Sequence, residues 1–345
     1  MRKKSHLYLI FVSLLSFALL ESCTEGDDLE LDGDGPGGAD VTIPDFNFPS
    51  SITFEQNLSA YNIYEGSAHD LLPASDYHLI ELSSELFTDY SQKQRLVKVP
   101  EGERMTRNAD GSLNFPDNTI LVKTFYYYFD EREVNLGKRL IETRLMIKEN
   151  NLWNIATYVW NAEQTEATLA LNGLDTQVNW VSEEGINRST LYRVPTENEC
   201  IACHQSNSTT IPLGTTLRNL NRAIIRNNLN LNQIAHLQSV GAIDAFDINL
   251  VSQIADYNNT DESLVNRARA YMDMNCAHCH NPNAWEEPAE EDMDFRYETP
   301  YNQTGIAQES DEIAEMVADG EMPFIGTTVL DDEGVQLIIA YINSL

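Results

Sequence analysis

A short pattern of cysteine and histidine occurs twice in the chain and constrains the protein more than any other sequence feature. In each copy two residues separate two cysteines, and a histidine follows the second cysteine directly. This is the attachment spacing of c-type haem, in which two thiols add across the vinyl groups and the histidine ligates the iron. We therefore expect two covalently attached haems. The copies are Cys200-Ile201-Ala202-Cys203-His204 and Cys276-Ala277-His278-Cys279-His280.

The cysteine count agrees with this interpretation. The chain has five cysteines; four lie in the two pentads and the fifth is Cys23, so none is left for a disulfide. Two Cys-x-x-Cys pairs can also form a four-thiolate zinc site, but here the pairs are far apart and each carries an immediate histidine. A thioredoxin-like redox pair needs a βαβ setting, which the sequence around the pentads does not indicate.

The start of the chain indicates export from the cytoplasm. Three basic residues precede an apolar run from Leu7 to Leu20, and Glu21-Ser22-Cys23 follows. This order is typical of a lipoprotein signal peptide over residues 1–22, so we expect cleavage before Cys23 and a lipid on its thiol. The run is short for a membrane span. The alternative is an ordinary signal peptide that leaves a free cysteine.

The segment after the signal peptide predicts a flexible attachment to the membrane. Residues 23–42 are rich in Gly and Asp, which is typical of a disordered tether. The acidic stretch 24–28 resembles the export signal of surface lipoproteins in Bacteroidota-like bacteria. We therefore expect an outer membrane lipoprotein in the cell envelope of a Gram-negative bacterium, facing the periplasm or the surface. Because haem is attached outside the cytoplasm, export and the pentads agree independently.

The charge balance bears on the partners. The chain has 22 Lys and Arg residues against 54 Asp and Glu residues, a formal net charge of −32. A protein of this charge repels phosphate backbones, which excludes nucleic acid as a partner. It attracts a basic redox partner, because opposite charges steer brief encounters between proteins. Solubility alone is the simpler explanation of the same charge.

The pattern from residue 43 to 195 predicts a β-rich domain. From Ile141 to Lys148 apolar and polar residues alternate with a period of two, and a polar turn leads to a second run from Leu152 to Trp160, which predicts a hairpin. Further strand candidates are Arg95–Val99, Thr119–Phe129, Thr168–Leu171 with a turn at Asn172-Gly173, Thr176–Val181 and Ser189–Val194.

The rest of the chain favours helices. We expect a first haem segment over 196–258 and a compact cytochrome c-like domain with the second haem over 259–345. A helix capped by Thr260 or Asp261 enters the second pentad, and a last helix capped by Asp331 crosses it. Further helix candidates are Thr215–Asn227 and Leu231–Val240. The predicted fold class is α+β and multidomain, with a β-rich N-terminal domain followed by an all-α c-type cytochrome region.

Each pentad supplies one axial ligand, and the second must come from elsewhere. For the second haem the candidate is Met322, which lies on a loop before the last helix; a thioether favours Fe(II) and raises the potential. Met316 and a plain core methionine are the alternatives. For the first haem the candidate is His236, with Met272, Met274, an open position or a surface histidine as alternatives. His278 should be partly exposed.

Several stretches resemble a bacterial family of diheme c-type cytochromes, most of which are described as conserved hypothetical proteins. The resemblance covers the chain from about Leu72 to the C-terminus. It implies two covalent haems behind an uncharacterised N-terminal region and a parallel β-helix protein as a partner. The stretches are Lys123-Thr124-Phe125, Glu142-Thr143-Arg144-Leu145, Tyr158-Val159-Trp160-Asn161, Gln164-Thr165, Asn198-Glu199-Cys200, Ala268-Arg269-Ala270-Tyr271 and Asn275-Cys276-Ala277-His278-Cys279-His280.

These features favour an electron carrier over an independent enzyme. The leading hypothesis is a membrane-anchored diheme cytochrome that transfers single electrons between two haems of unlike potential and an outside partner. The alternative is a diheme peroxidase or dehydrogenase subunit whose β-rich domain binds substrate, because that domain is larger than electron transfer requires. A redox or gas sensor is a third class.

Overall fold

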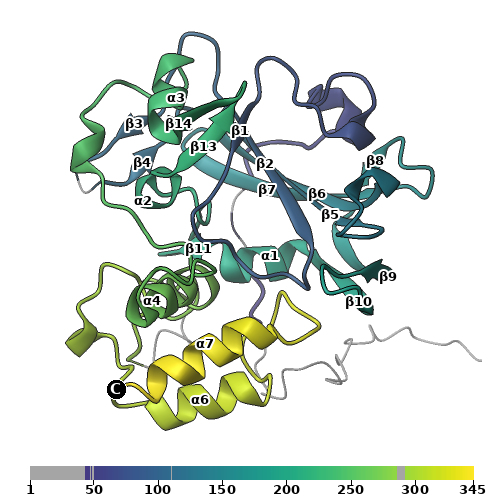
Figure 1. Cartoon of the computed structure of the whole chain (residues 1–345). Coiled ribbons are helices and arrows are strands. Elements are labelled where there is room, and N and C mark those ends of the chain that lie inside the picture. Colours follow the sequence, from purple (N-terminus) through teal and green to yellow (C-terminus); the bar gives the residue numbers. More distant parts are fainter. Residues whose placement is uncertain (1–42, 47, 49, 110, 286–291) are drawn as a thin grey trace, which may run out of the picture. The chain divides into compact units, whose positions relative to one another are not determined.

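The computed structural model describes residues 43–46, 48, 50–109, 111–285 and 292–345, all of which belong to one compact unit. The predicted signal peptide over residues 1–22, the predicted lipidation site Cys23 and the predicted tether over 23–42 lie outside the described residues. The N-terminal and central parts are rich in β-strands, and the longer helices lie toward the C-terminus (Figure 1). This agrees with the predicted order of a β-rich part before a helical part. The boundaries 43–195, 196–258 and 259–345 stay predictions.

A six-stranded antiparallel sheet dominates the described part of the chain (Figure 1). Its strand order is β1-β2-β5-β6-β7-β8, and the four central strands, β2, β5, β6 and β7, pair with one another along their length. The strands are β1 (His78–Ile80), β2 (Gln92–Lys98), β5 (Ile120–Tyr128), β6 (Lys138–Glu149), β7 (Leu152–Trp160) and β8 (Ala167–Leu169). Smaller pairs are β3 (Thr106–Arg107) with β4 (Leu113–Asn114), β9 (Asn172–Val181) with β10 (Asn187–Thr196), β11 (Gln205–Ser206) with β12 (Thr209–Thr210), and β13 (Ala223–Arg226) with β14 (Leu229–Asn232).

The predicted hairpin is present as β6 and β7. Asn150 and Asn151 connect the two strands with φ of 52° and 61°. Two successive left-handed residues make the type of turn whose twist matches that of paired strands, and asparagine tolerates this conformation. The two-residue turn sets the register, in which Glu149 pairs with Leu152 and Leu145 with Ala156.

Both faces of this sheet are buried, although the alternation in β6 is typical of a strand with one face in water. Leu145 lies in one apolar cluster with Leu96 and Val122, and Met146 lies in another with Val97. The polar positions of β6 are covered as well: the side chain of Glu142 is 0% exposed. The face with Met146 is covered in part by the first pentad, because Cys200 and Ile201 lie in the same cluster as Met146.

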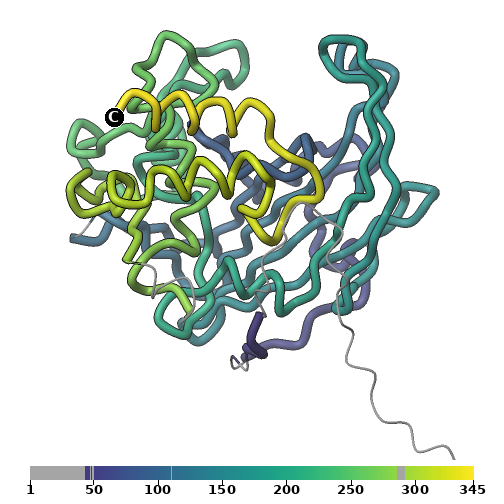
Figure 2. The backbone as a smooth tube through the Cα atoms, turned by 90° about the horizontal axis from the view of Figure 1, so that it is seen from below, coloured from purple at the N-terminus to yellow at the C-terminus, as the bar shows by residue number. Residues whose placement is uncertain are grey.

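Helices cover that face and form the C-terminal part. Cys200 and Ile201 of α1 pack with Val97 and Met146 of the sheet. Toward the C-terminus α4, α6 and α7 lie beside one another, as Figures 1 and 2 both show. The helices are α1 (Glu197–Cys203), α2 (Leu217–Leu220), α3 (Gln233–Ser239), α4 (Leu264–Asn275), α6 (Ser310–Ala318) and α7 (Asp332–Ile342), with short 3₁₀ turns η1 (Leu58–Tyr61), η2 (Ala68–Asp70), η3 (Val134–Leu136), η4 (Ile248–Leu250) and η5 (Tyr301–Gln303).

The predicted contact between the helix before the second pentad and the last helix is present. Asp331 caps α7 and accepts a hydrogen bond from the Gly334 N–H at 3.0 Å, as expected. Leu337 and Tyr341 of α7 are buried in one cluster with Ala268 of α4. Gly334 lies so close to the Tyr271 ring that a Cβ at this position would overlap it. Glycine here lets the two helices approach closely.

Three local predictions are wrong. The helix expected over Thr215–Asn227 is short: α2 ends at Leu220, and β13 and β14 follow as a hairpin whose turn residues Asn227 and Asn228 have φ of 50° and 62°. Two adjacent asparagines between apolar runs favour this turn over a helix. The cap of α4 is Ser263 rather than Thr260 or Asp261.

The third wrong prediction is the turn at Asn172-Gly173. Both residues lie in β9, which pairs with β10, whereas β8 pairs with β7. A Cβ on Gly173 would lie 2.9 Å from the carbonyl oxygen of Val194, so glycine here permits close approach of β10. The asparagine-glycine pair thus serves strand contact and not chain reversal.

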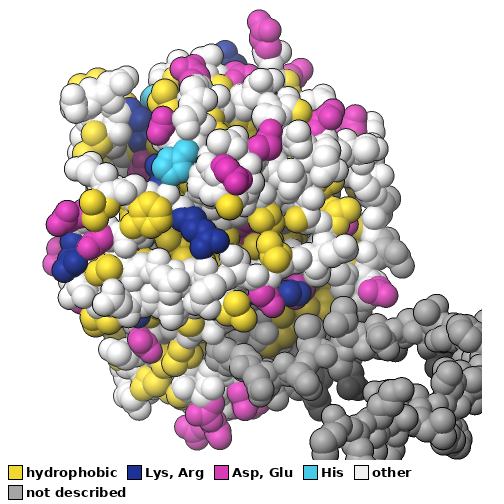
Figure 3. All heavy atoms as spheres, turned by 90° about the vertical axis from the view of Figure 1, so that its right-hand side faces the viewer, with side chains coloured by type: hydrophobic (Ala, Val, Ile, Leu, Met, Phe, Trp, Pro, Cys, Tyr) yellow, Lys and Arg dark blue, Asp and Glu magenta, His cyan; other side chains and the backbone are white. Residues whose placement is uncertain are grey.

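Two surface features complete the description. Within the described residues, none of the helices combines the length and apolar character that a bilayer crossing requires. The face drawn in Figure 3 shows acidic side chains scattered among basic and hydrophobic ones. On this face the negative net charge therefore does not gather into one patch.

Candidate haem site

Both pentads form a single helical turn with the same hydrogen bond. The N–H of His204 donates to the carbonyl of Cys200 at 2.9 Å, and the N–H of His280 donates to the carbonyl of Cys276 at 2.9 Å. Residues three and four apart in such a turn lie on one side of it. Each pentad therefore presents two thiols and an imidazole on one side, which is the arrangement that a thioether-linked porphyrin requires.

Local sequence explains how each turn forms. Thr196 and Glu199 make a capping box that begins α1, and the first pentad occupies the end of this helix. Such a cap contributes about 1 kcal/mol to helix stability. The second pentad follows α4 directly, because Cys276 is the C-terminal cap of that helix. Burial raises the pKa of the Cys200 and Cys276 thiols to about 12.

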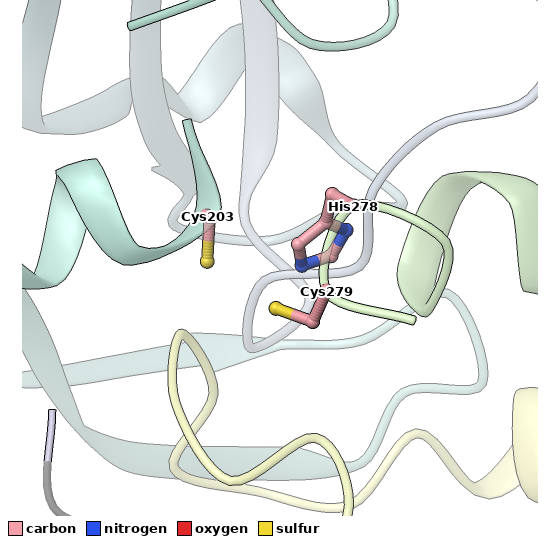
Figure 4. A group of neighbouring side chains, drawn as sticks. All are labelled: Cys203, His278 and Cys279. Atoms are coloured by element: carbon pink, nitrogen blue, oxygen red, sulfur yellow. The ribbon is translucent and has the colours of Figure 1, made fainter. Parts of the chain in front are cut away.

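The structure brings the two pentads together. Ligand atoms of Cys203, His278 and Cys279 lie within 4.8 Å of one another. Figure 4 shows Cys203 at the end of α1 and the other two on the segment after α4, with the Cys279 sulfur directed toward Cys203. The thiol of Cys279 is the main reason that the pKa of Cys203 lies well below its usual value. His278 is half-buried, as predicted.

A backbone hydrogen bond joins the segments that follow the pentads. The N–H of Asn207 donates to the carbonyl of Asn283 at 2.9 Å. Each asparagine lies three residues beyond the histidine of its own pentad. The two attachment segments therefore approach each other at equivalent positions, and not only through their side chains.

The imidazole of His204 is oriented by the backbone. Its Nδ1 lies 2.9 Å from the carbonyl oxygen of Ile211, so Nδ1 carries the proton and donates. This fixes the tautomer in which Nε2 has a free lone pair, the usual orientation of a metal-binding histidine. Burial is the main reason that the pKa of His204 is lowered to about 4, which keeps the ring neutral.

Aromatic rings lie beside the second pentad and the segment that follows it. The rings of His280 and Phe295 lie 5.1 Å apart, and the N–H of Phe295 donates to the His280 carbonyl at 3.1 Å. Trp285, five residues beyond His280, contacts Phe324 with ring centroids 6.3 Å apart. Phe324 belongs to the loop that carries Met322, between α6 and α7. The structure therefore brings the Met322 loop next to the segment after the second pentad.

Met322 itself is half-buried, and its N–H donates to the carbonyl of Met316 at 3.2 Å. The β-rich part holds the same loop through Asp89, whose carboxylate accepts hydrogen bonds from Thr328 and Val329. Asp89 is 2% exposed, and burial is the main reason that its pKa is raised. Sequence reasoning missed Asp89, because no local pattern marks it.

No group of the first pentad is among those whose charges act on His236. His236 lies on α3, and the charged groups that act on it or that it acts on are Arg226 and His78. Met274 lies in the apolar cluster that contains Cys200 and Ile201, and so do Ile234 and Leu237 of α3. The sulfur of Met274 accepts a hydrogen bond from the Asn219 side chain at 3.3 Å. His236 and Met274 as ligands of the first iron both stay predictions.

The residues around the pentads fit a covalently bound haem. Among the buried side-chain donors that lack a hydrogen-bond partner within the described residues, three belong to residues in or near the pentads: Gln205 Nε2, His278 Nδ1 and Trp285 Nε1. They lie directly after the first pentad, within the second and shortly after the second. An unpaired buried donor costs about 1–3 kcal/mol, so their presence here indicates an acceptor that the polypeptide does not supply. The carboxylates of haem are such acceptors.

A four-thiolate zinc site does not assemble. The group of possible metal ligands found among the described residues contains one cysteine from each pair, Cys203 and Cys279, with His278. Cys200 and Cys276 are not part of it. The donor set thus fits two haem attachment turns better than the zinc alternative.

Comparison with known families agrees with this geometry. Residues 263–342 match the family described as cytochrome C oxidase, cbb3-type, subunit III, which comprises c-type cytochromes. No curated protein and no solved structure matches the chain. The matched segment contains α4, the second pentad, Met322 and α7, whereas the first pentad lies before it. Fold and site together define a c-type cytochrome domain.

That domain occupies residues 263–342 of this chain, and such a domain binds haem covalently and suggests electron transfer. The similarity covers less than half of the chain, so it describes this segment and not the whole protein. The β-rich part and the first pentad are described by the structure alone.

Proposed function

We propose that the chain is a diheme c-type cytochrome that transfers single electrons in the cell envelope. The observation that carries the proposal is the contact between the two pentads, in which Cys203 and Cys279 approach within 4.8 Å and Asn207 bonds to Asn283. When bound, haem supplies the one-electron Fe(III)/Fe(II) couple. Two attachment turns that face each other at this range would keep both redox centres within one short path.

Each residue of the proposed site has a defined role. Cys200 and Cys203 would hold one haem and Cys276 and Cys279 the other, while His204 and His280 would ligate the two irons. The carbonyl of Ile211 orients His204 at 2.9 Å. Met322 is the proposed second ligand of the second iron, supported by the position of its loop beside Trp285. A thioether on that iron would give it a higher potential than a nitrogen-ligated partner.

The cellular setting is also proposed. The N-terminal pattern supports an outer membrane lipoprotein held by a lipid on Cys23 and facing the periplasm or the surface. The net charge of −32 supports a basic redox protein as the partner. A parallel β-helix protein, implied by the family resemblance, is a second candidate partner.

Haem counting tests the proposal directly. The mature wild-type protein should contain two haems by intact mass and by a pyridine hemochrome assay. Replacing both cysteines of the first pentad, Cys200→Ala with Cys203→Ala, should leave one haem. The matching pair Cys276→Ala with Cys279→Ala should leave the other. A wild-type protein with a single haem refutes the diheme proposal.

Redox titration tests the relay. We expect two separate midpoint potentials in the wild-type protein, and only one in each double-alanine protein. Identical potentials for the two haems would contradict a relay between unequal centres, even where the haem count is two.

A second candidate function is a diheme peroxidase or a dehydrogenase subunit. The observation that favours it is the environment of His236, whose electrostatic partners are Arg226 and His78 and include no group of the first pentad. A first iron without a second protein ligand has an open position, which peroxide chemistry requires. Mixing the reduced protein with peroxide distinguishes the two functions. Fast reoxidation favours the enzyme, and slow reoxidation favours the carrier.

A further inference from the structure

A row of basic side chains crosses the sheet on the face that the first pentad covers. Arg95 of β2 pairs with Lys123 of β5, and Lys123 pairs with Arg144 of β6. Directly paired residues of neighbouring strands point to the same face, so the three side chains form one row, called here the cationic row. In a chain with a net charge of −32, three adjacent cations within the sheet are unexpected on composition alone.

The cationic row leads to the first haem attachment site. Arg144 pairs with Thr157 of β7, which extends the row by one strand. The hydroxyl of Thr157 lies 4.0 Å from the sulfur of Cys200. The charges of Lys123 and Arg144 also act on His204. The row therefore runs under the position where Cys200 and Cys203 would hold a haem.

The outer members of the row have acidic partners. Arg95 donates two hydrogen bonds to the Glu85 carboxylate, at 2.9 and 3.0 Å. Arg144 donates two to the Glu142 carboxylate, at 2.9 and 2.6 Å. Glu142 is fully buried and also accepts a hydrogen bond from Tyr192. Two of the three positive charges are thus compensated.

The middle member, Lys123, has no carboxylate partner among the described residues. Its ammonium lies 4.7 Å from the centre of the Phe125 ring, and Arg144 contacts the same ring at 4.5 Å. Like charges directly opposite each other in a sheet are destabilising. Burial and the neighbouring cations lower the pKa of Lys123 well below its usual value, so its protonated form is held at a cost that a bound anion would offset.

A thioether-linked haem brings such an anion to this place. Its thioether bonds lie at one edge of the macrocycle and its two carboxylates at the opposite edge. Lys123 stands two strands from Thr157, about 10 Å by the spacing of neighbouring strands, which is comparable to that width. A haem held at Cys200 can therefore direct a carboxylate toward Lys123.

We infer that the cationic row binds a carboxylate of the haem attached at Cys200 and Cys203, with Lys123 as the direct partner and Arg95 and Arg144 at its sides. This inference rests on the proposed diheme function. A cation beside the carboxylate disfavours the more positive ferric state. Lys123 therefore raises the potential of the first haem, and its removal lowers that potential.

The test uses the mature full-length protein with its haems. Lys123→Met removes the charge and keeps an unbranched side chain on Phe125, whereas Lys123→Arg keeps the charge. Lys98→Met is the matched control, because Lys98 belongs to the same strand as Arg95 but to the opposite face, where it pairs with Asp76. Haem content is measured first, and the two midpoint potentials are then measured at fixed ionic strength.

We expect the Lys123→Met protein to keep two haems. At a fixed ambient potential the ratio of ferric to ferrous iron in one haem should rise about tenfold, which corresponds to a midpoint potential lower by about 59 mV for one electron. Lys123→Arg and Lys98→Met should leave both potentials unchanged. Loss of one haem in Lys123→Met but not in Lys123→Arg also supports the inference, since the charge is then needed for loading.

One result overturns the inference alone, namely a two-haem Lys123→Met protein whose potentials equal those of the wild type. In that case calorimetry tests a free carboxylate ligand: binding of succinate to the wild-type holoprotein that Lys123→Met abolishes would assign Lys123 to such a ligand. A wild-type protein that lacks the first haem overturns the proposed function as well as this inference.

Discussion

Asp89 binds Thr328 through both carboxylate oxygens, one to the backbone N–H at 2.7 Å and one to the hydroxyl at 2.9 Å. The first residue lies in the β-rich part and the second in the loop that leads from Met322 to α7. A third hydrogen bond comes from the N–H of Val329 at 3.2 Å. The loop that carries the proposed iron ligand therefore depends on a buried carboxylate outside the cytochrome segment.

Removing the carboxylate of Asp89 should free this loop. Asp89 has φ of 48°, so Asp89→Gly removes the hydrogen bonds without the strain that alanine has in the left-handed region. Three donors lose their acceptor, and we expect a loss of about 1–3 kcal/mol in the free energy of unfolding. Asp89→Asn keeps a carbonyl oxygen for the two N–H groups and is the control. If the glycine variant and the wild type are equally stable in urea, the hydrogen bonds of the Asp89 carboxylate to this loop do not contribute to stability.

The same residue predicts a pH dependence. Burial raises the pKa of Asp89 above its unfolded value of about 3.9, so between these two values the folded state binds a proton that the unfolded state lacks. The contribution of Asp89 to stability is therefore fully present below the unfolded pKa and is lost as the pH rises through the folded pKa. The difference in unfolding free energy between the wild type and Asp89→Asn should fall over this window. If the difference in unfolding free energy between the two proteins does not change with pH, the pKa of Asp89 is not raised in the folded state.

The contact between α4 and α7 makes Gly334→Ala a sharp test of packing. Alanine is favoured over glycine inside a helix by about 1 kcal/mol, so without a clash the variant would be more stable. Because a Cβ would overlap the Tyr271 ring, we expect instead a loss of about 1–3 kcal/mol. Gln336→Ala, at an exposed position of the same helix, is the control. Thermal unfolding measures both.

The partner substitution separates the clash from other causes. Tyr271→Leu shortens the side chain that the new methyl group meets. In that background Gly334→Ala should cost less, with a coupling energy of at least about 0.5 kcal/mol in a double-mutant cycle. Additive effects of the two substitutions would mean that the helices do not meet at these residues.

Local chemistry made the attachment turns and the long strands predictable, because each is set by residues close in sequence. The two pentads, the Asn150-Asn151 hairpin and the Asp331 cap all depend on neighbours a few residues away. The short α2 was missed although the Asn227-Asn228 turn beyond it is a local signal, whereas the strand role of Asn172-Gly173 is decided by pairing with Val194 and Thr196 of β10. Local patterns do not contain that pairing.

The same limit explains why the cationic row was not predicted. Lys123 and Arg144 were visible as parts of two strands, and both lie in stretches that carry the family resemblance. That Lys123 and Arg144 form one row follows from the strand register, which pairs them. That this row lies at the first pentad follows from the packing of α1 on the same face of the sheet. His236 was selected from the sequence because it is the sole histidine between His204 and the second pentad. Its surroundings on α3, where Arg226 acts on it, are set by tertiary packing, which the sequence interval does not contain.

Lipid attachment at Cys23 is testable without structural information. Cys23→Ser should abolish the lipid, so that intact mass loses the acyl groups and the protein moves from the membrane fraction to the soluble fraction. The haem count should stay at two, because both pentads lie far from this residue in sequence. A serine variant that stays in the membrane fraction would contradict the lipoprotein prediction.

Methionine ligation of the second iron is the prediction that most directly links the loop to the redox chemistry. Met322→Ala should abolish the weak absorbance near the red end of the visible spectrum that reports an iron–sulfur bond, and it should lower the potential of that haem, because a thioether favours Fe(II). Met316→Ala is the matched control, since both methionines are half-buried and a backbone hydrogen bond joins them. The band should persist in this control. Loss of the band in Met316→Ala with retention in Met322→Ala would assign the ligand to α6. Retention in both would mean that neither methionine ligates the second iron.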